Sequence, residues 1–146
     1  MMKVYRISAI TLKVKNMEKS CSLYSKLPGF RLTYGGKPSD SFSTFEIGEG
    51  SKAATYLNLE WIEHDQGTFD VSKKPNLRKR KVSQDFGRVI FHTENVDRLY
   101  SYMKNDECIS KSIVFENEPI DAPWGERFFH IREPNGYQLS FAQPLS

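Results

Sequence analysis

Hydrophobic and polar residues follow the same pattern twice along this chain. An alternating segment from Ile10 runs into Asn16, and a second alternating segment, from Val89 to Asn95, repeats the pattern 79 positions later. Alternation with a period of two predicts a strand. Asparagine suits a helix N-cap, because its side chain accepts a hydrogen bond from a free N–H of the first turn. The sequence therefore predicts an internal repeat in which a strand leads into a helix.

Each predicted strand is followed by a segment with helical spacing of its apolar residues. In both halves these residues fall on one face of a helix: Met17, Cys21, Tyr24 and Leu27 in the first, and Val96, Leu99, Tyr100 and Met103 in the second. Pro28-Gly29 is predicted to end the first helix, and the polar run Asn105-Asp106-Glu107 to end the second.

Three further strands are predicted after each helix. They are residues 30–34, 41–47 and 54–62 in the first half, and 111–115, 127–132 and 137–142 in the second. Each half is thus predicted to be a βαβββ module, which makes the chain an α+β protein. The modules span about residues 4–64 and 86–143 of one domain, residues 1–146, and the polar segment 65–85 is the expected linker.

The composition is that of a soluble globular protein. Of 146 residues, 38% are hydrophobic and 27% charged, so the chain has enough apolar side chains for a core. No apolar run approaches the roughly 18 residues that a membrane span needs, and the N-terminus does not resemble a secretory signal. Cys21 and Cys108 have no metal-binding spacing and are expected to be free thiols. We expect a cytoplasmic protein that does not contact membranes.

The net charge of +3 comes from one short segment. Six basic residues lie between Lys73 and Lys81, and without them the remaining chain has a charge of −3. The segment has no interleaved aromatic residues and no helical periodicity, so nucleic-acid binding is not favoured. We interpret it as a solvated part of the linker whose role the sequence leaves open.

Two motifs resemble a known family. The segment from Ala9 to Ser20, with Leu27-Pro28-Gly29 after it, is similar to the opening of glyoxalase-family domains, and Pro123-Trp124-Gly125 followed by Pro134-Asn135-Gly136 is similar to their ending. The chain is identified by this resemblance as a member of the glyoxalase / bleomycin-resistance / extradiol-dioxygenase (vicinal oxygen chelate) superfamily. The resemblance implies two βαβββ modules that form a cupped mixed sheet, often completed as a homodimer.

The resemblance also implies where a metal would bind in the family's metal enzymes. In this sequence the four ligand positions fall on Ala9, Tyr56 (or Asn58), Arg88 and Ser140. None of these is a good ligand for a divalent cation, since alanine has no donor atom and arginine brings a positive charge. A shift of two residues would bring Glu60 to the second position without changing the other three. We therefore expect no metal and no other cofactor.

Alternation assigns further residues to the face that carries these positions. The predicted ligand-binding residues are Arg88, Tyr56, Asn58, Trp124, Phe128, Gln138 and Ser140. Arg88 is interpreted either as the anchor of an anionic ligand or as the partner of a carboxylate such as Glu60. His92, His130 and Glu60 are the catalytic candidates, as relocated metal ligands or with a histidine as general base.

Two hypotheses about function follow. The first is a metal-independent protein of the glyoxalase/bleomycin-resistance type that binds a small aromatic or anionic molecule, as a homodimer. The second is a metal-dependent lyase or isomerase that resembles glyoxalase I (lactoylglutathione lyase) with relocated ligands, the only case that needs a divalent metal. Whether the chain is an enzyme stays open; if it is, a glyoxalase-like lyase/isomerase or a dioxygenase is expected, because this superfamily hosts several chemistries on one fold.

Overall fold

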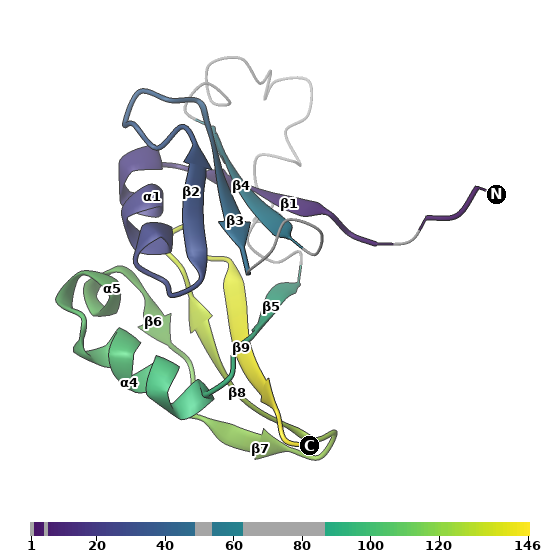
Figure 1. Cartoon of the computed structure of the whole chain (residues 1–146). Helices are drawn as coiled ribbons and strands as arrows, with labels where there is room; N and C mark the ends of the chain where they lie inside the picture. The colour runs from purple at the N-terminus through teal and green to yellow at the C-terminus, as the bar shows by residue number, and fades with distance from the viewer. Residues whose placement is uncertain (1, 5, 49–53, 63–86) are drawn as a thin grey trace, which may run out of the picture. The chain divides into compact units, whose positions relative to one another are not determined.

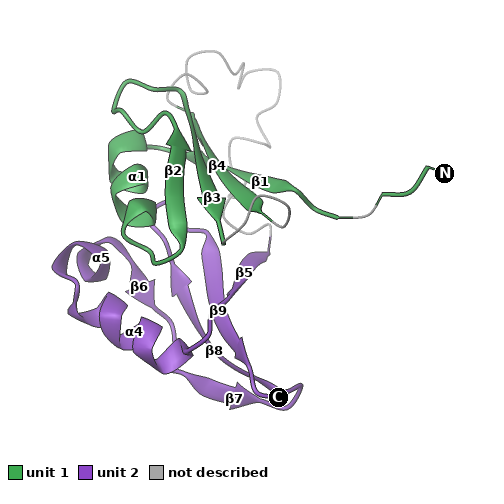
Figure 2. Cartoon of the chain, viewed as in Figure 1, with its two compact units in different colours: residues 1–70 green, residues 71–146 purple. Residues whose placement is uncertain are grey.

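A computed structural model describes residues 2–4, 6–48, 54–62 and 87–146. The chain divides into two compact units, residues 1–70 (unit 1) and 71–146 (unit 2), which Figure 2 shows in green and purple. The predicted linker 65–85, including Lys73 to Lys81, lies outside the described residues. No described helix is long and apolar enough to cross a membrane.

Unit 1 is a four-stranded sheet with one helix (Figure 1). Its elements are β1 (Ala9–Val14), α1 (Met17–Ser25), β2 (Phe30–Tyr34), β3 (Phe42–Ile47) and β4 (Thr55–Trp61). The strand order is β1-β4-β3-β2, with β1 and β4 parallel and the other neighbours antiparallel. This is the predicted βαβββ module.

Unit 2 repeats this plan with two additions. Its elements are β5 (Arg88–His92), α4 (Val96–Asn105), α5 (Glu107–Ser112), β6 (Val114–Phe115), β7 (Ile120–Ala122), β8 (Glu126–Arg132) and β9 (Gln138–Pro144). The order is β5-β9-β8-β6, with β7 also paired to β8, and β5 is parallel to β9. The predicted α+β class is confirmed.

The internal repeat extends to the register of the strands. Ala9 pairs with Tyr56 at the start of the parallel pair in unit 1, and Arg88 pairs with Gln138 at the start of the parallel pair in unit 2. The repeat seen along the sequence is therefore also a repeat of backbone pairing, which makes Arg88 the structural counterpart of Ala9.

Helix starts in both units follow the sequence prediction. The side chain of Asn16 accepts a hydrogen bond from the N–H of Lys19 at 2.9 Å, and that of Asn95 accepts one from Arg98 at 3.0 Å. Both asparagines have extended backbones, as N-cap residues do. Each cap satisfies one N–H that the helix itself leaves without an acceptor.

The cores form between each helix and one face of its sheet. In unit 1, Tyr24 of α1 is fully buried and its ring lies 6.1 Å from that of Phe45 in β3. In unit 2, Tyr100 of α4 makes edge-on contact with Phe129 of β8 at 5.1 Å. Because side chains alternate along a strand, packing one face against the helix directs the next residues to the opposite face.

The structure corrects the sequence prediction in the middle of unit 2. The run after α4 starts a second helix, because the Asp106 side chain accepts a hydrogen bond from the N–H of Ile109. Lys111 and Ser112, predicted to be in a strand, end this helix, and β6 keeps only Val114–Phe115. The short strand β7 was not predicted, since three residues are too few to show alternation.

We predict that replacing Asn95 by alanine lowers the free energy of unfolding by about 1 kcal/mol, because the cap of α4 is lost. Urea denaturation followed by circular dichroism measures the change. Asn95→Asp is the matched control and keeps most of the stability, since a carboxylate can accept the same bond. Identical midpoints for the alanine variant and the natural protein would contradict the prediction.

Candidate functional site

Unit 2 has one sheet face that packs against α4 and another that does not. The second face, which we call the open face of unit 2, carries alternate residues of three neighbouring strands. These are Arg88, Ile90 and His92 of β5, Gln138, Ser140 and Ala142 of β9, and Glu126, Phe128, His130 and Arg132 of β8. The open face thus brings together Arg88, Gln138, Ser140, Phe128 and both histidine candidates, as alternation predicted.

A chain of hydrogen bonds crosses one end of this face. Arg88 donates from Nε to Gln138 Oε1 at 2.8 Å, and Gln138 donates from Nε2 to Glu116 Oε1 at 2.8 Å. Arg132 donates from Nε to the other oxygen of Glu116 at 2.9 Å. Burial by itself raises the pKa of the Glu116 carboxyl, but the bonds from Gln138 and Arg132 outweigh it and hold the pKa below its ordinary value.

Aromatic rings form a row that begins at Trp124, in the turn before β8, and continues along β8. The rings of Trp124 and Phe128 are stacked with centroids 6.0 Å apart, and those of Phe128 and His130 lie 4.8 Å apart. Trp124 is 69% exposed. Phe128 and His130 are half-buried, so Trp124 is the exposed end of the row.

His130 is the last ring of this row, in electrostatic range of the Arg88 guanidinium. Its Nδ1 is buried and has no hydrogen-bond partner among the described residues. Burial, and after it the positive charge of Arg88, lowers the pKa of the imidazole, whereas Glu116 acts in the opposite direction. A lowered pKa favours the neutral ring, which suits a histidine placed near two arginines.

In unit 1, the predicted residues Tyr56 and Asn58 lie on the face of the sheet that does not pack against α1. The Asn58 side chain donates to Thr11 Oγ1 at 3.2 Å and accepts from Thr44 Oγ1 at 2.9 Å. This amide is engaged on both sides by β1 and β3. Tyr56 is half-buried and Glu60 is exposed on the same face.

His92 has a partner that the sequence did not indicate. Its Nε2 lies 2.9 Å from Oε2 of Glu126, and the indole N–H of Trp124 donates to Oε1 of the same carboxylate at 3.1 Å. His92 and Glu126 are 34 residues apart and lie on β5 and β8, two strands that flank β9.

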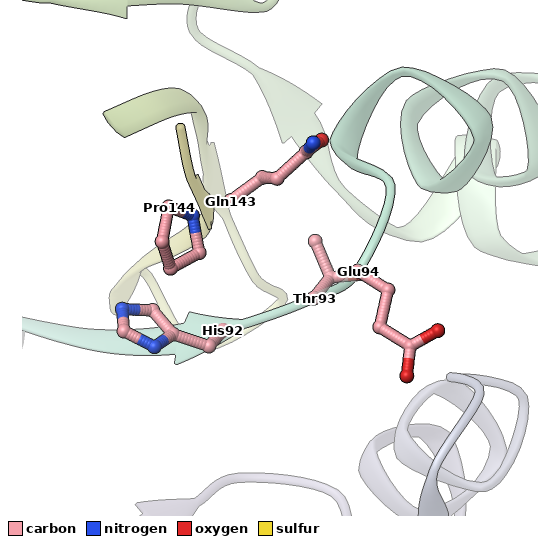
Figure 3. A pocket seen from close by; sticks show the side chains of 5 residues that line it. All are labelled: His92, Thr93, Glu94, Gln143 and Pro144. Carbon is pink, nitrogen blue, oxygen red and sulfur yellow. The ribbon is translucent and has the colours of Figure 1, made fainter. Parts of the chain in front are cut away.

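A cavity of about 420 Å³ opens beside this pair, at the C-terminal ends of β5 and β9 (Figure 3). Its lining residues are His92, Thr93, Glu94, Gln143 and Pro144. His92 alone among them was predicted from the sequence. Gln143 lies on the helix side of its strand, so alternation alone would have assigned it to the core.

The predicted catalytic candidates do not form a metal-binding group among the described residues. His92 contacts Glu126, whereas His130 contacts Phe128, and Glu60 belongs to unit 1. No set of three or more His, Cys, Asp or Glu side chains in the described part of the chain is arranged to hold a metal ion.

The sequence signature of the Glyoxalase/Bleomycin resistance protein/Dioxygenase superfamily matches residues 6–141. The chain belongs to this superfamily. The glyoxalase resemblance seen in the two motifs is thereby confirmed, and the match spans both βαβββ units. No curated protein matches the sequence of this glyoxalase-superfamily chain.

Solved structures with the same fold support this membership. A glyoxalase/bleomycin resistance protein/dioxygenase from Nocardioides is 22% identical, with a TM-score of 0.63 over 100% of this chain and 87% of that one. A family enzyme from Burkholderia phytofirmans PsJN is 12% identical, with a TM-score of 0.67 over 94% and 98%. TnmS3, an antibiotic binding protein from Streptomyces sp. CB03234, is 20% identical, with a TM-score of 0.60 over 99% of both chains. At these identities the similarity establishes the fold.

The pKa of His130 reports the electrostatic effect of the Arg88 charge. We predict that Arg88→Gln raises the pKa of His130, because removing a positive charge no longer disfavours the imidazolium form. Proton NMR titration of the imidazole ring measures the shift. Arg98→Gln, which removes an exposed arginine from α4, is the matched control and leaves the titration unchanged. An unaltered His130 titration in Arg88→Gln would show that the two groups do not interact.

Proposed function

We propose that this glyoxalase-superfamily protein binds a small aromatic anion on the open face of unit 2, without a metal ion. The observation that carries the proposal is the position of Arg88 on the same sheet face as the aromatic row Trp124–Phe128. In the strand register Arg88 lies level with Gln138 and Arg132, and Phe128 lies four residues further along β8. The proposed ligand therefore stacks its ring on the row and extends its acidic group past His130 towards the guanidinium. Gln138 and Ser140 belong to the same proposed site, and Tyr56 and Asn58 of unit 1 stay predicted contacts.

The guanidinium of Arg88 has N–H groups that do not bond to any of the described residues. Its Nε bonds to Gln138, and no bond joins its two terminal nitrogens to the described residues. Two parallel N–H groups match the spacing of two carboxylate oxygens, so one arginine can hold a carboxylate with two hydrogen bonds. The bond to Gln138 holds the Nε end of the guanidinium, so its two terminal nitrogens can bind a ligand.

The aromatic row supplies the apolar part of the site. Trp124 and Phe128 have nearly parallel rings, 21° apart, so they present faces of similar orientation to a flat ligand. Stacking of aromatic rings contributes about 0.5–1.5 kcal/mol per pair beyond the area that it buries. Ser140 is 3% exposed, so it forms the floor between the strands and contributes little contact area.

The residues at the family's metal-ligand positions do not fit a divalent cation. Ala9 offers no donor atom, and Arg88 places a positive charge on the open face, where it would repel a metal ion. Tyr56 and Ser140 are neutral and are poor ligands without a deprotonating partner. These side chains support loss of the metal site. No contact among the described residues favours the metal-dependent lyase hypothesis.

The antibiotic-binding neighbour TnmS3 gives independent support for a binding role on this fold. The superfamily includes enzymes as well as binding proteins, so the fold by itself does not decide between them. The chemistry of the open face, with one arginine and a row of rings, favours binding.

We expect 2-naphthoate to raise the melting temperature of the protein and 2-naphthamide, its neutral isostere, to have a smaller effect. In calorimetric titrations Arg88→Ala should weaken naphthoate binding at least tenfold, because a charge-assisted bidentate hydrogen bond is lost. The same variant should leave naphthamide binding nearly unchanged. Phe128→Ala should weaken both compounds, because it removes a stacking partner.

Arg98→Ala is the control for general loss of positive charge in the same unit. Equal affinity of Arg88→Ala and the natural protein for naphthoate would contradict the role of Arg88. Metal analysis of protein purified without chelators or an affinity tag separates the alternatives. About one tightly bound divalent ion per chain would contradict the metal-free proposal.

The homodimer implied by the family resemblance stays a prediction. We expect light scattering of the purified protein to give twice the 16.9 kDa mass of one chain at micromolar concentration. A constant mass of one chain over a hundredfold range of concentration would contradict it.

A further inference from the structure

Strand pairing arranges the side chains of the open face of unit 2 at three levels along β5, β9 and β8, which lie side by side in Figure 1. The levels are Arg88, Gln138 and Arg132 for the first, Ile90, Ser140 and His130 for the second, and His92, Ala142 and Phe128 for the third. A strand rises about 3.3 Å per residue, so the first and third levels, four residues apart, are separated by about 13 Å.

The third level and the turn beside it form an apolar end of the open face, which we call the ring end. Ile120 of β7 pairs directly with Phe128, so the two side chains lie on the same face. Ile120 is exposed, and so is Trp124, whose ring stacks on Phe128. The ring end therefore offers an aromatic ligand apolar contact from β7, from β8 and from the turn between them.

The charges on the open face determine which end receives the acid. At the ring end, the carboxylate of Glu126 accepts the indole N–H of Trp124 and repels a second carboxylate. At the second level, burial and the charge of Arg88 lower the pKa of His130, so its ring is neutral at neutral pH and does not attract an anion. The acid is therefore held at the first level, by Arg88.

The distance between the ring end and Arg88 requires a spacer in the ligand. The bond from Nε of Arg88 to Gln138 keeps the guanidinium at the first level. A hydrogen bond to the ligand takes up about 3 Å of the roughly 13 Å, which leaves about 10 Å between the ring and the carboxylate oxygens. With carbon–carbon bonds of about 1.5 Å, a carboxylate attached directly to a naphthalene ring is too short, and about three methylene groups close the gap.

Ile90 lies between the two ends and indicates the chemistry of that spacer. Its side chain is 55% exposed, whereas Ser140, its neighbour at the second level, is buried. Methylene groups that lie against Ile90 lose contact with water, which favours binding. A spacer of methylene groups gains this contact, and a polar spacer of the same length loses hydration instead.

We propose that the ligand of the open face is an aryl-alkanoic acid, in which about three methylene groups separate the aromatic ring from the carboxylate. This inference rests on the proposed function and specifies the ligand of the same site. The carboxylate binds the terminal nitrogens of Arg88, the spacer crosses Ile90, and the ring stacks at Trp124 and Phe128. Naphthoate bound to Arg88 reaches Phe128 with its far ring but does not reach Trp124.

Calorimetric titration of the full chain with 2-naphthoate and 4-(2-naphthyl)butanoate tests the spacer. We expect the butanoate to bind about tenfold more tightly, because only this acid reaches Trp124 while it is bound to Arg88. Arg88→Ala should weaken both acids at least tenfold. The two corresponding amides control for apolar area, and their affinities should differ less, since an amide is not held at Arg88 and its ring can move to Trp124.

Trp124→Ala is the test of the ring end. It should weaken binding of the butanoate about fivefold and that of naphthoate less than twofold, because naphthoate does not reach this ring. Trp124→Phe keeps a ring without the indole N–H and should retain most of the affinity. Tyr102→Ala removes an exposed ring from α4, on the other side of the sheet, and as the matched control should change neither affinity.

Ile90→Ser tests the contact with the spacer. We expect it to weaken binding of the butanoate about threefold, because the methylene groups lose an apolar neighbour. Ile90→Val keeps most of that contact and should bind nearly as the natural protein does. Equal affinity of Ile90→Ser and the natural protein would show that the spacer does not cross Ile90 and would overturn this path for the ligand.

Two further outcomes would overturn the spacer. One is naphthoate that binds as tightly as the butanoate, and the other is Trp124→Ala that weakens both acids equally. In either case, weaker naphthoate binding by Arg88→Ala still supports the proposed function. If Arg88→Ala changes the affinity for neither acid, the proposed function fails and the inference fails with it.

Discussion

Parallel pairing between the first and last strand is the constraint on which each unit depends. It joins segments about 50 residues apart, so that β1 lies beside β4 and β5 beside β9. Once that register is set, alternation decides which side chains pack against the helix and which form the open face. A shift of one residue would exchange the two sets and place charged residues in the core, which explains why the register is strongly specified.

The parallel pairing of β5 with β9 places two different groups of side chains at opposite ends of the open face of unit 2. At the N-terminal ends of β5 and β9, Arg88 and Gln138 form a cationic and polar end that suits an anion. At the C-terminal ends, His92 meets Glu126 beside a cavity. Glu126 links the second end to the aromatic row through its bond to Trp124. The open face therefore carries Arg88 and Gln138 at one end, and at the other end Trp124 and the pair His92–Glu126.

The repeat allows equivalent positions of the two units to be compared, and their side chains differ. The positions that pair as Ala9 and Tyr56 in unit 1 pair as Arg88 and Gln138 in unit 2. The backbone tolerates these changes because none of these four side chains is buried: Arg88 is exposed, and Ala9, Tyr56 and Gln138 are half-buried. Core positions are more restricted, since a buried polar or charged replacement would have to find a partner. Functional change on this fold is therefore concentrated on one face of each sheet.

The sequence by itself determined the elements that depend on local patterns. The repeat, the asparagine caps and the sides of the strands could be read directly, because alternation, helical spacing and capping each involve residues a few positions apart. Only the tertiary structure decided that His92 contacts Glu126 and that Gln143 holds the N–H of Val96 while lining a cavity. Those contacts join residues 34 and 47 positions apart, and they depend on strand order and register, which no local periodicity contains.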